Sequence, residues 1–136
     1  SSIMIGSDLE RIADHAKSIA RLVIGRLGEP PLTPGGDLIE LGTAAQRMLD
    51  RALESLAGLD PIAARELGPA DDEVDALYAR VKKRIASQLV ASPANAARIA
   101  DLLFVAHNLE RIADRSTNVA ERTIYIASGE LVELNP

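Results

Sequence analysis

The sequence contains no cysteine, which excludes disulfide bonds and thiolate-ligated metal sites. It has no tryptophan, one phenylalanine and two tyrosines, so a core must consist of aliphatic side chains, many of which favour helices. No apolar run approaches the roughly 20 residues that span a bilayer, and no signal peptide is visible. With 136 residues and 47% apolar composition, we expect one compact, soluble domain.

Basic charge is also scarce. The net charge is −5, and the only dense basic cluster in the sequence, at residues 82–84, is typical of a solvated helix face. Because a sequence-independent contact with nucleic acid requires a basic face, we expect no nucleic-acid partner.

A six-residue segment, Leu-Glu-Arg-Ile-Ala-Asp, occurs twice in the chain, at residues 9–14 and 109–114. In each copy a glutamate and an aspartate lie four residues apart on one face of a predicted helix, where both can reach one cation. Packing alone would constrain the apolar positions and leave the polar ones free to differ. The repeated acids therefore indicate a metal site, and they are Glu10, Asp14, Glu110 and Asp114.

Glycine and proline divide the first half of the chain into helices. The first helix is predicted to run from the N-terminus to residue 27, where Gly28 and a pair of prolines stop it. The second is predicted to begin at Asp37, whose spacing from Glu40 is that of a capping box, and to end at Gly58.

Two further helices are predicted in the second half. Asp60 is a predicted N-cap followed by proline, and Gly68-Pro69 should kink or break the stretch that it opens. Ser92, again followed by proline, opens the longest helix, which runs to residue 128 with Gly129 as its stop. Because no window alternates like a strand, we predict an all-α fold, an antiparallel helical bundle.

A third acidic pair, Asp71 and Asp75, repeats the four-residue spacing near the start of the main part of the third helix. Acids near a helix start also complement the helix dipole, so this pair alone does not require a site. If the third and fourth helices pack antiparallel, however, the pair converges with Glu110 and Asp114. Such an oxygen-rich site suits a hard cation such as Mg²⁺, Mn²⁺, Ca²⁺ or iron.

Other side chains on the same faces could extend this ligand set. The possible additional ligands are Glu121, His107 and Asn118. Zinc is disfavoured, because the sequence offers nitrogen ligands only from its two histidines, His15 and His107.

Two alternatives to a regulatory metal site stay open. In the first, the acids reach water and pair with Arg111 or Arg115, and the chain is a helical scaffold without metal. In the second, carboxylate-bridged metals support oxidase chemistry in a helical bundle. Such oxidases use Glu-x-x-His ligands, however, and neither His15 nor His107 has a glutamate three residues before it.

The segments around these acids resemble the PhoU family of phosphate-uptake regulators. Members of this family contain two tandem three-helix bundles, with acidic E/D-x-x-x-D motifs on facing helices. Residues 8–16 look like the end of the first bundle, and residues 72–78, 107–114 and 118–122 look like parts of the second. The resemblance extends over the whole chain but over only part of a typical family member.

This resemblance implies a domain organisation. Residues 1–28 would be the last helix of a truncated first bundle, 29–36 a linker, 37–129 a complete second bundle and 130–136 a frayed tail. We expect that residues preceding Ser1 are missing. The first helix is then an orphan whose apolar surface must be covered, either by folding onto its own bundle or by pairing with another chain, and we favour a homo-oligomer, most simply a homodimer.

The resemblance also implies metal clusters at the acidic motifs. The implied ligands are Asp71, Asp75, Glu110 and Asp114 in the complete bundle, with Glu10 and Asp14 as half of the other site. The first copy departs from the second, with Ser18 and Arg21 where the second has Asn118 and Glu121. Because two carboxylates fill only part of a hard cation's shell, we expect the first site to be empty or labile.

Family members are regulatory proteins and not enzymes. The resemblance implies a cytoplasmic protein, peripheral to the membrane at most, with two partners: the ATPase of an ABC-type phosphate transporter and a sensor histidine kinase. Relaying the state of the transporter to the kinase would restrain phosphate uptake and the phosphate-starvation response.

Overall fold

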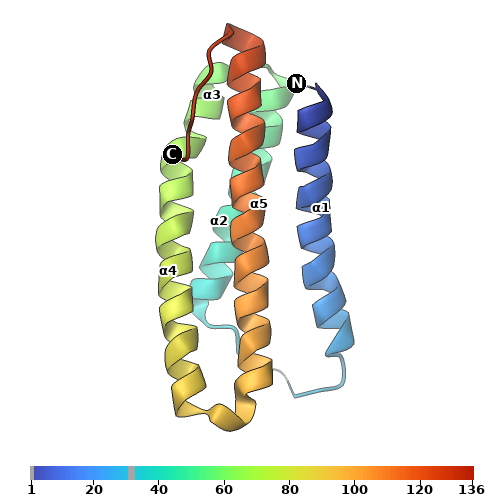
Figure 1. Ribbon diagram of the computed structural model, residues 1–136, viewed down its shortest axis with the longest axis vertical. Helices are drawn as coiled ribbons and strands as arrows, with labels where there is room; N and C mark the ends of the chain where they lie inside the picture. Colours follow the sequence, from blue (N-terminus) through green and yellow to red (C-terminus); the bar gives the residue numbers. More distant parts are fainter. Residues whose placement is uncertain (1, 31–32) are drawn as a thin grey trace.

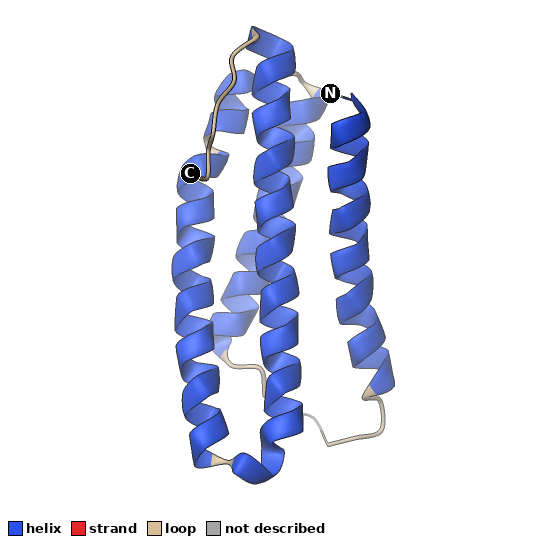
Figure 2. Ribbon diagram, viewed as in Figure 1, coloured by secondary structure: helices blue, strands red, loops and turns tan. Residues whose placement is uncertain are grey.

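The computed structural model describes residues 2–30 and 33–136, so Pro31 and its predicted part in stopping the first helix lie outside the described residues. Within these ranges every regular element is helical and no strand is present, which confirms the predicted all-α class (Figure 2). The elements are α1 Ser2–Gly25, α2 Gly36–Ala57, α3 Pro61–Arg65, α4 Leu67–Ala91, the 3₁₀ turn η1 Pro93–Asn95 and α5 Ala96–Ser128.

Helix α5 lies at the centre of the molecule. It packs against α2 and α4 on one side and against α1 on the other, and both α1 and α4 run antiparallel to it (Figure 1). Aliphatic side chains fill the space between α2, α4 and α5, as the composition predicts. The largest fully buried apolar side chains are Leu41, Met48, Leu67, Val74, Val81, Ile85, Val119 and Ile124.

Two predicted helix boundaries are confirmed by their cap geometry. The Asp60 carboxylate accepts hydrogen bonds from the backbone N–H groups of Ile62 and Ala63, each at 3.1 Å, and so caps α3. Gly129 ends α5 in the left-handed conformation, with φ 75°, which glycine adopts without steric cost.

The third predicted helix is interrupted, as expected, but the break lies slightly before the glycine and proline at residues 68 and 69. α3 ends at Arg65, and α4 begins at Leu67 after Glu66. Pro69 therefore falls in the first turn of α4, where a backbone N–H would have no partner within the helix. The interruption is real, but proline is tolerated just inside the new helix.

Two predicted caps are wrong. Helix α2 begins at Gly36, so Asp37 lies inside the helix and is not its N-cap; the Asp37 carboxylate accepts a hydrogen bond from the adjacent Leu38 N–H and lies 2.8 Å from the Arg84 guanidinium. Hydrogen bonding to Arg84 lowers the pKa of Asp37. Ser92 likewise makes no side-chain cap, and the turn η1 intervenes before α5. The first helix ends at Gly25, a little before the predicted residue 27.

Residues 130–136, predicted to be a frayed tail, lie against the bundle in the structure. Val132 and Leu134 pack against the main core, while Leu131 before them and Glu133 between them are exposed. This alternation is that of an extended segment with one apolar side, and the segment runs back alongside α5 towards the start of α4 (Figure 1).

No single helix of the described part is long and apolar enough to cross a membrane. By length and composition, only the stretch Pro61–Ala91 taken together with Pro93–Ser128 passes that test, as a pair bent by 115°.

Candidate metal centre

Helices α4 and α5 bring three carboxylates together. Asp71 and Asp75 lie one turn apart on α4, and Asp114 approaches them from α5. One carboxylate oxygen from each of the three lies within 4.8 Å of those of the other two. Glu110 lies one turn before Asp114 on α5, so the antiparallel packing of the two helices gathers the four acids predicted to bind metal in the complete bundle in one region.

Asp71 is the most unusual member of this group. Its side chain is fully buried, and neither carboxylate oxygen has a hydrogen-bond partner among the described residues. Burial and then repulsion from Asp75 and Asp114 raise the pKa of Asp71 from 3.8 to about 7. The nearby Thr117 hydroxyl would lower this pKa by donating to Asp71, but it donates to the Ala113 carbonyl oxygen at 3.1 Å. A buried carboxylate without a partner is costly, so this position points to a ligand.

The neighbouring acids are shifted in the same direction. Partial burial of its carboxylate raises the pKa of Asp75, although the residue as a whole is exposed, and repulsion from Asp114 and Asp72 adds to the shift. Burial, contact with the Asp114 carboxylate and repulsion raise the pKa of Glu110 to about 7. Carboxylates crowded in this way repel one another when ionised. A hard cation would remove the repulsion, and the all-oxygen donor set suits Mg²⁺, Mn²⁺, Ca²⁺ or iron.

Ion pairing among the described residues does not relieve this crowding. The Arg111 guanidinium lies 3.9 Å from an Asp114 carboxylate oxygen, and both side chains are partly exposed, so this pair is weak. Arg115 is directed to the other side of α5, where it contacts Asp8 at 3.5 Å. The alternative in which the acids simply pair with Arg111 or Arg115 therefore gives no account of Asp71.

The three possible additional ligands have other partners. The exposed His107 has its Nδ1 atom 3.4 Å from the Tyr78 hydroxyl. The Asn118 side-chain amide lies 3.5 Å from an Asp8 oxygen, and Glu121 accepts a hydrogen bond from the Leu134 backbone N–H at 2.9 Å. In the part of the chain that the structure describes, none of the three belongs to the carboxylate group on α4 and α5.

The two acids of the first copy of the repeat have surroundings different from those of the second. Glu10 and Asp14 are both exposed on α1, and no carboxylate from another described helix joins them. The difference follows from what covers each helix. Four residues of α1 are exposed although their repeat equivalents on α5 are buried by α2 and α4: Ala13 and Ala113, Ala16 and Ser116, Ala20 and Ala120, Ile24 and Ile124.

An ion-pair cluster between α1 and α5 is a feature that sequence reasoning missed. Asp8 is 3% exposed, and its carboxylate lies 3.1 Å from the Arg122 guanidinium and 3.5 Å from that of Arg115. In the second copy Asn108 occupies the position equivalent to Asp8, and its side-chain oxygen lies 2.9 Å from Nδ1 of His15. Comparing the residues just outside the identical repeat would have singled out this pair of positions.

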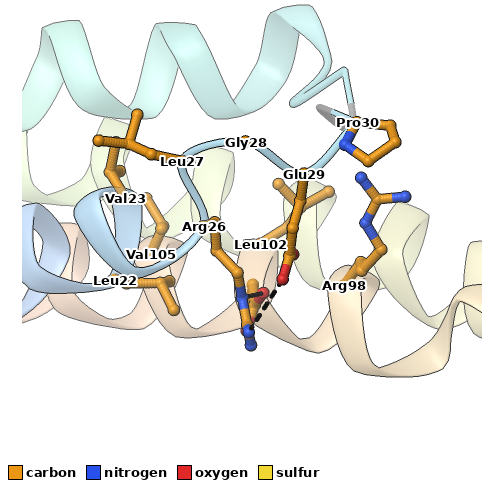
Figure 3. A pocket seen from close by; sticks show the side chains of 11 residues that line it. Leu22, Val23, Arg26, Leu27, Gly28, Glu29, Pro30, Arg98, Leu102 and Val105 are labelled. Atoms are coloured by element: carbon orange, nitrogen blue, oxygen red, sulfur yellow. Dashed lines mark hydrogen bonds and ion pairs between the residues drawn. The ribbon is translucent and has the colours of Figure 1, made fainter.

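A hollow of about 420 Å³ lies between the C-terminal end of α1 and the beginning of α5 (Figure 3). Leu22, Val23 and Leu102 form part of its apolar wall. The Arg26 guanidinium at its edge hydrogen-bonds Asp101 at 2.7 Å. On α5 this edge is about 20 Å from Asp114, at 1.5 Å rise per residue, so the hollow is separate from the acidic group.

Comparisons with known proteins find relatives of this chain by sequence. The family model for the PhoU domain matches residues 38–123. A relative from Clostridium acetobutylicum, named a phosphate-specific transport system accessory protein PhoU homolog, is 33% identical over 99% of this chain and 62% of its own length. A relative of the same name from Rhizobium meliloti is 35% identical over 94% of this chain and 54% of its own length.

Solved structures of proteins with the same family name are also similar to this chain. The phosphate transport system regulatory protein PhoU from Streptococcus pneumoniae has a TM-score of 0.80 and 30% identity, with 93% of this chain and 60% of that chain covered. PhoU from Pseudomonas aeruginosa has a TM-score of 0.82 and 30% identity, with 90% and 59% covered. This chain thus spans less than two thirds of the proteins that it matches. The family-model match and the relatives together establish that the chain belongs to the PhoU family.

Proposed function

We propose that this chain is part of a metal-binding regulator of phosphate uptake. In this proposal a hard cation is held by Asp71, Asp75, Glu110 and Asp114. The observation that carries the metal assignment is the fully buried, unpartnered carboxylate of Asp71 facing two further carboxylates. A cation there would supply the opposite charge and the coordination that these oxygens lack.

The regulatory part of the proposal is supported by the relatives. Several carry the name of a phosphate-specific transport system accessory protein, and a similar solved structure is titled a regulatory protein. We propose that the chain acts without catalysing a reaction, on the cytoplasmic side of the membrane, on the ATPase of a phosphate transporter and on a sensor histidine kinase. The cation would fix the relative position of α4 and α5, and through them the surface offered to these partners.

Metal analysis of matched variants tests the cation site. The parent chain, purified without added metal and then dialysed against Mn²⁺, should retain the ion, and a variant with Asp75→Asn and Asp114→Asn should not. Asp72→Asn is the control, because Asp72 carries the same charge on the same turn of α4 but is exposed and lies outside the group. Equal Mn²⁺ retention by the double variant and the parent would contradict the assignment.

Phosphate uptake tests the regulatory part separately. A bacterial strain that lacks its own regulator of this family would be given the full-length protein with or without the two substitutions. We expect the unsubstituted protein to restrain uptake of radioactive phosphate and the variant to restrain it less. If both restrain uptake equally while only one retains Mn²⁺, the cation has no part in regulation.

A further inference from the structure

A segment at the C-terminal end of the chain borders the acidic group. This strap, residues 130–136, leaves the end of α5 and turns back alongside α5 towards the start of α4 (Figure 1). It is fastened at its start by an ion pair between Glu130 and Arg65. Further along, the apolar side chains of Val132 and Leu134 pack against the main core.

The far end of the strap contacts both helices that carry the acids. Leu134 lies against Gly68, where an added Cβ would be 3.6 Å from the Leu134 carbonyl oxygen. Gly68 is three residues before Asp71 on α4. On α5 the Leu134 N–H donates to the Glu121 carboxylate at 2.9 Å, and the Asn135 side-chain amide donates to Asp114 at 3.4 Å. The strap therefore bridges α4 and α5 at the Asp71 end of the acidic group.

Along α4, the exposure of the two acids differs with their distance from the strap. Asp71, which is closest along α4 to the strap contact at Gly68, is fully buried. Asp75, one turn farther from the strap, is exposed. A hydrated cation that reaches Asp71 must shed or rearrange its water, and it must also displace the Asn135 amide from Asp114 or turn that amide around.

The strap is held by few contacts, so opening it requires little local disruption. Leu131 is 88% exposed, Glu133 is exposed, and the hydrogen bond from Asn135 is long. Segments with few buried apolar contacts and exposed backbone hydrogen bonds open locally without global unfolding.

We propose that the strap is a lid on the cation site, with Glu121 as its latch. In this reading Glu121 is not a metal ligand: its carboxylate accepts a hydrogen bond from the Leu134 N–H and thereby keeps the strap against α4 and α5. Opening the lid admits or releases the cation, and closing it shields Asp71 from water. This inference rests on the proposed cation site.

Release kinetics of a luminescent cation test the lid. Tb³⁺ is a hard, oxygen-seeking ion whose emission is excited through a nearby tyrosine, and Tyr78 lies beside Glu110. The loaded chain would be mixed with excess chelator, and the emission decay followed. We expect Leu134→Ala and Glu121→Ala each to release Tb³⁺ about tenfold faster than the parent, because each removes a contact that holds the lid closed.

Matched controls separate the lid from general effects. Glu133→Ala alters an exposed residue of the same strap, and Gly68→Ala adds a methyl group at an ordinary contact distance from Leu134, so both should release Tb³⁺ at the parent rate. If Leu134→Ala and Glu121→Ala bind Tb³⁺ fully but release it at the parent rate, the lid is overturned and the cation site is not. Absence of Tb³⁺ from the parent itself would overturn the cation site and the lid together.

A second measurement needs no metal. In the metal-free chain the Leu134 amide should exchange with deuterium more slowly in the parent and in Glu133→Ala than in Glu121→Ala, which removes its acceptor. Equal exchange rates of this amide in the parent and in Glu121→Ala would contradict the role of Glu121 as the latch.

Discussion

Replacing Asp71 by asparagine should stabilise the metal-free protein. The carboxyl group of Asp71 has a pKa of about 7 in the folded chain against 3.8 ordinarily, so the folded state binds its proton more tightly than the unfolded state does. The raised pKa means that folding stability falls as pH rises from about 4 to about 7 and is then constant. A shift of about three pKa units corresponds to about 4 kcal/mol, which is the upper limit of this loss.

Asparagine has nearly the same shape and carries no charge, but its buried amide also lacks partners. That amide costs about 1–2 kcal/mol, so the net gain of Asp71→Asn above pH 7 should be about 2 kcal/mol. The assay is urea unfolding followed by circular dichroism in the presence of chelator, at several values between pH 4.5 and pH 8. The advantage of Asp71→Asn should shrink towards the acid end, where the parent carboxyl is protonated in the folded state.

Asp72→Asn provides the control for this experiment, since its side chain is exposed on the same helix and should change stability little at any pH. Glu110, whose pKa is also raised, is present in all three proteins and largely cancels in the differences. Equal pH slopes for the parent and Asp71→Asn, or a less stable Asp71→Asn at pH 8, would refute the reasoning that Asp71 is a strained, uncompensated carboxylate.

Three further predictions concern α1. Asp8→Ala should lower the free energy of unfolding by about 2 kcal/mol, because Arg115 and Arg122 lose their shared partner; urea unfolding checks this, and a loss below 0.5 kcal/mol would contradict it. Glu10→Gln with Asp14→Asn should leave Mn²⁺ stoichiometry unchanged, whereas Glu110→Gln with Asp114→Asn should reduce it in the same elemental analysis. The exposed apolar residues of α1, Ile24 among them, should make the isolated chain dimerise, and a concentration-independent monomer in analytical ultracentrifugation would count against that.

The sequence predicts most of the helices and the region of the candidate site because both depend on local signals. Asp60 and Gly129 act through their own turns of backbone, so their effects can be read from adjacent residues. The acids at four-residue spacing lie on one helix face whatever the tertiary structure is, and antiparallel packing of neighbouring helices is enough to bring Asp71 near Asp114.

Other features depend on contacts between distant segments. Asp37 looks like a helix cap, but Arg84 of α4 takes its carboxylate, and only the packed bundle reveals this competition. Asp8 is buried because α1 crosses α5 at Arg115 and Arg122. The strap looks like a frayed tail because its apolar positions are few, and they are partly buried only by packing against the core that the helices form.

The most direct test of the cation site is an anomalous difference map from crystals of this chain soaked in Mn²⁺. The arrangement of the described acids predicts a strong peak among the carboxylates of Asp71, Asp75 and Asp114, and none beside Glu10 and Asp14 unless another chain supplies further acids. A map with no peak at the first group, or with a peak only at Glu10 and Asp14, would contradict the central claim.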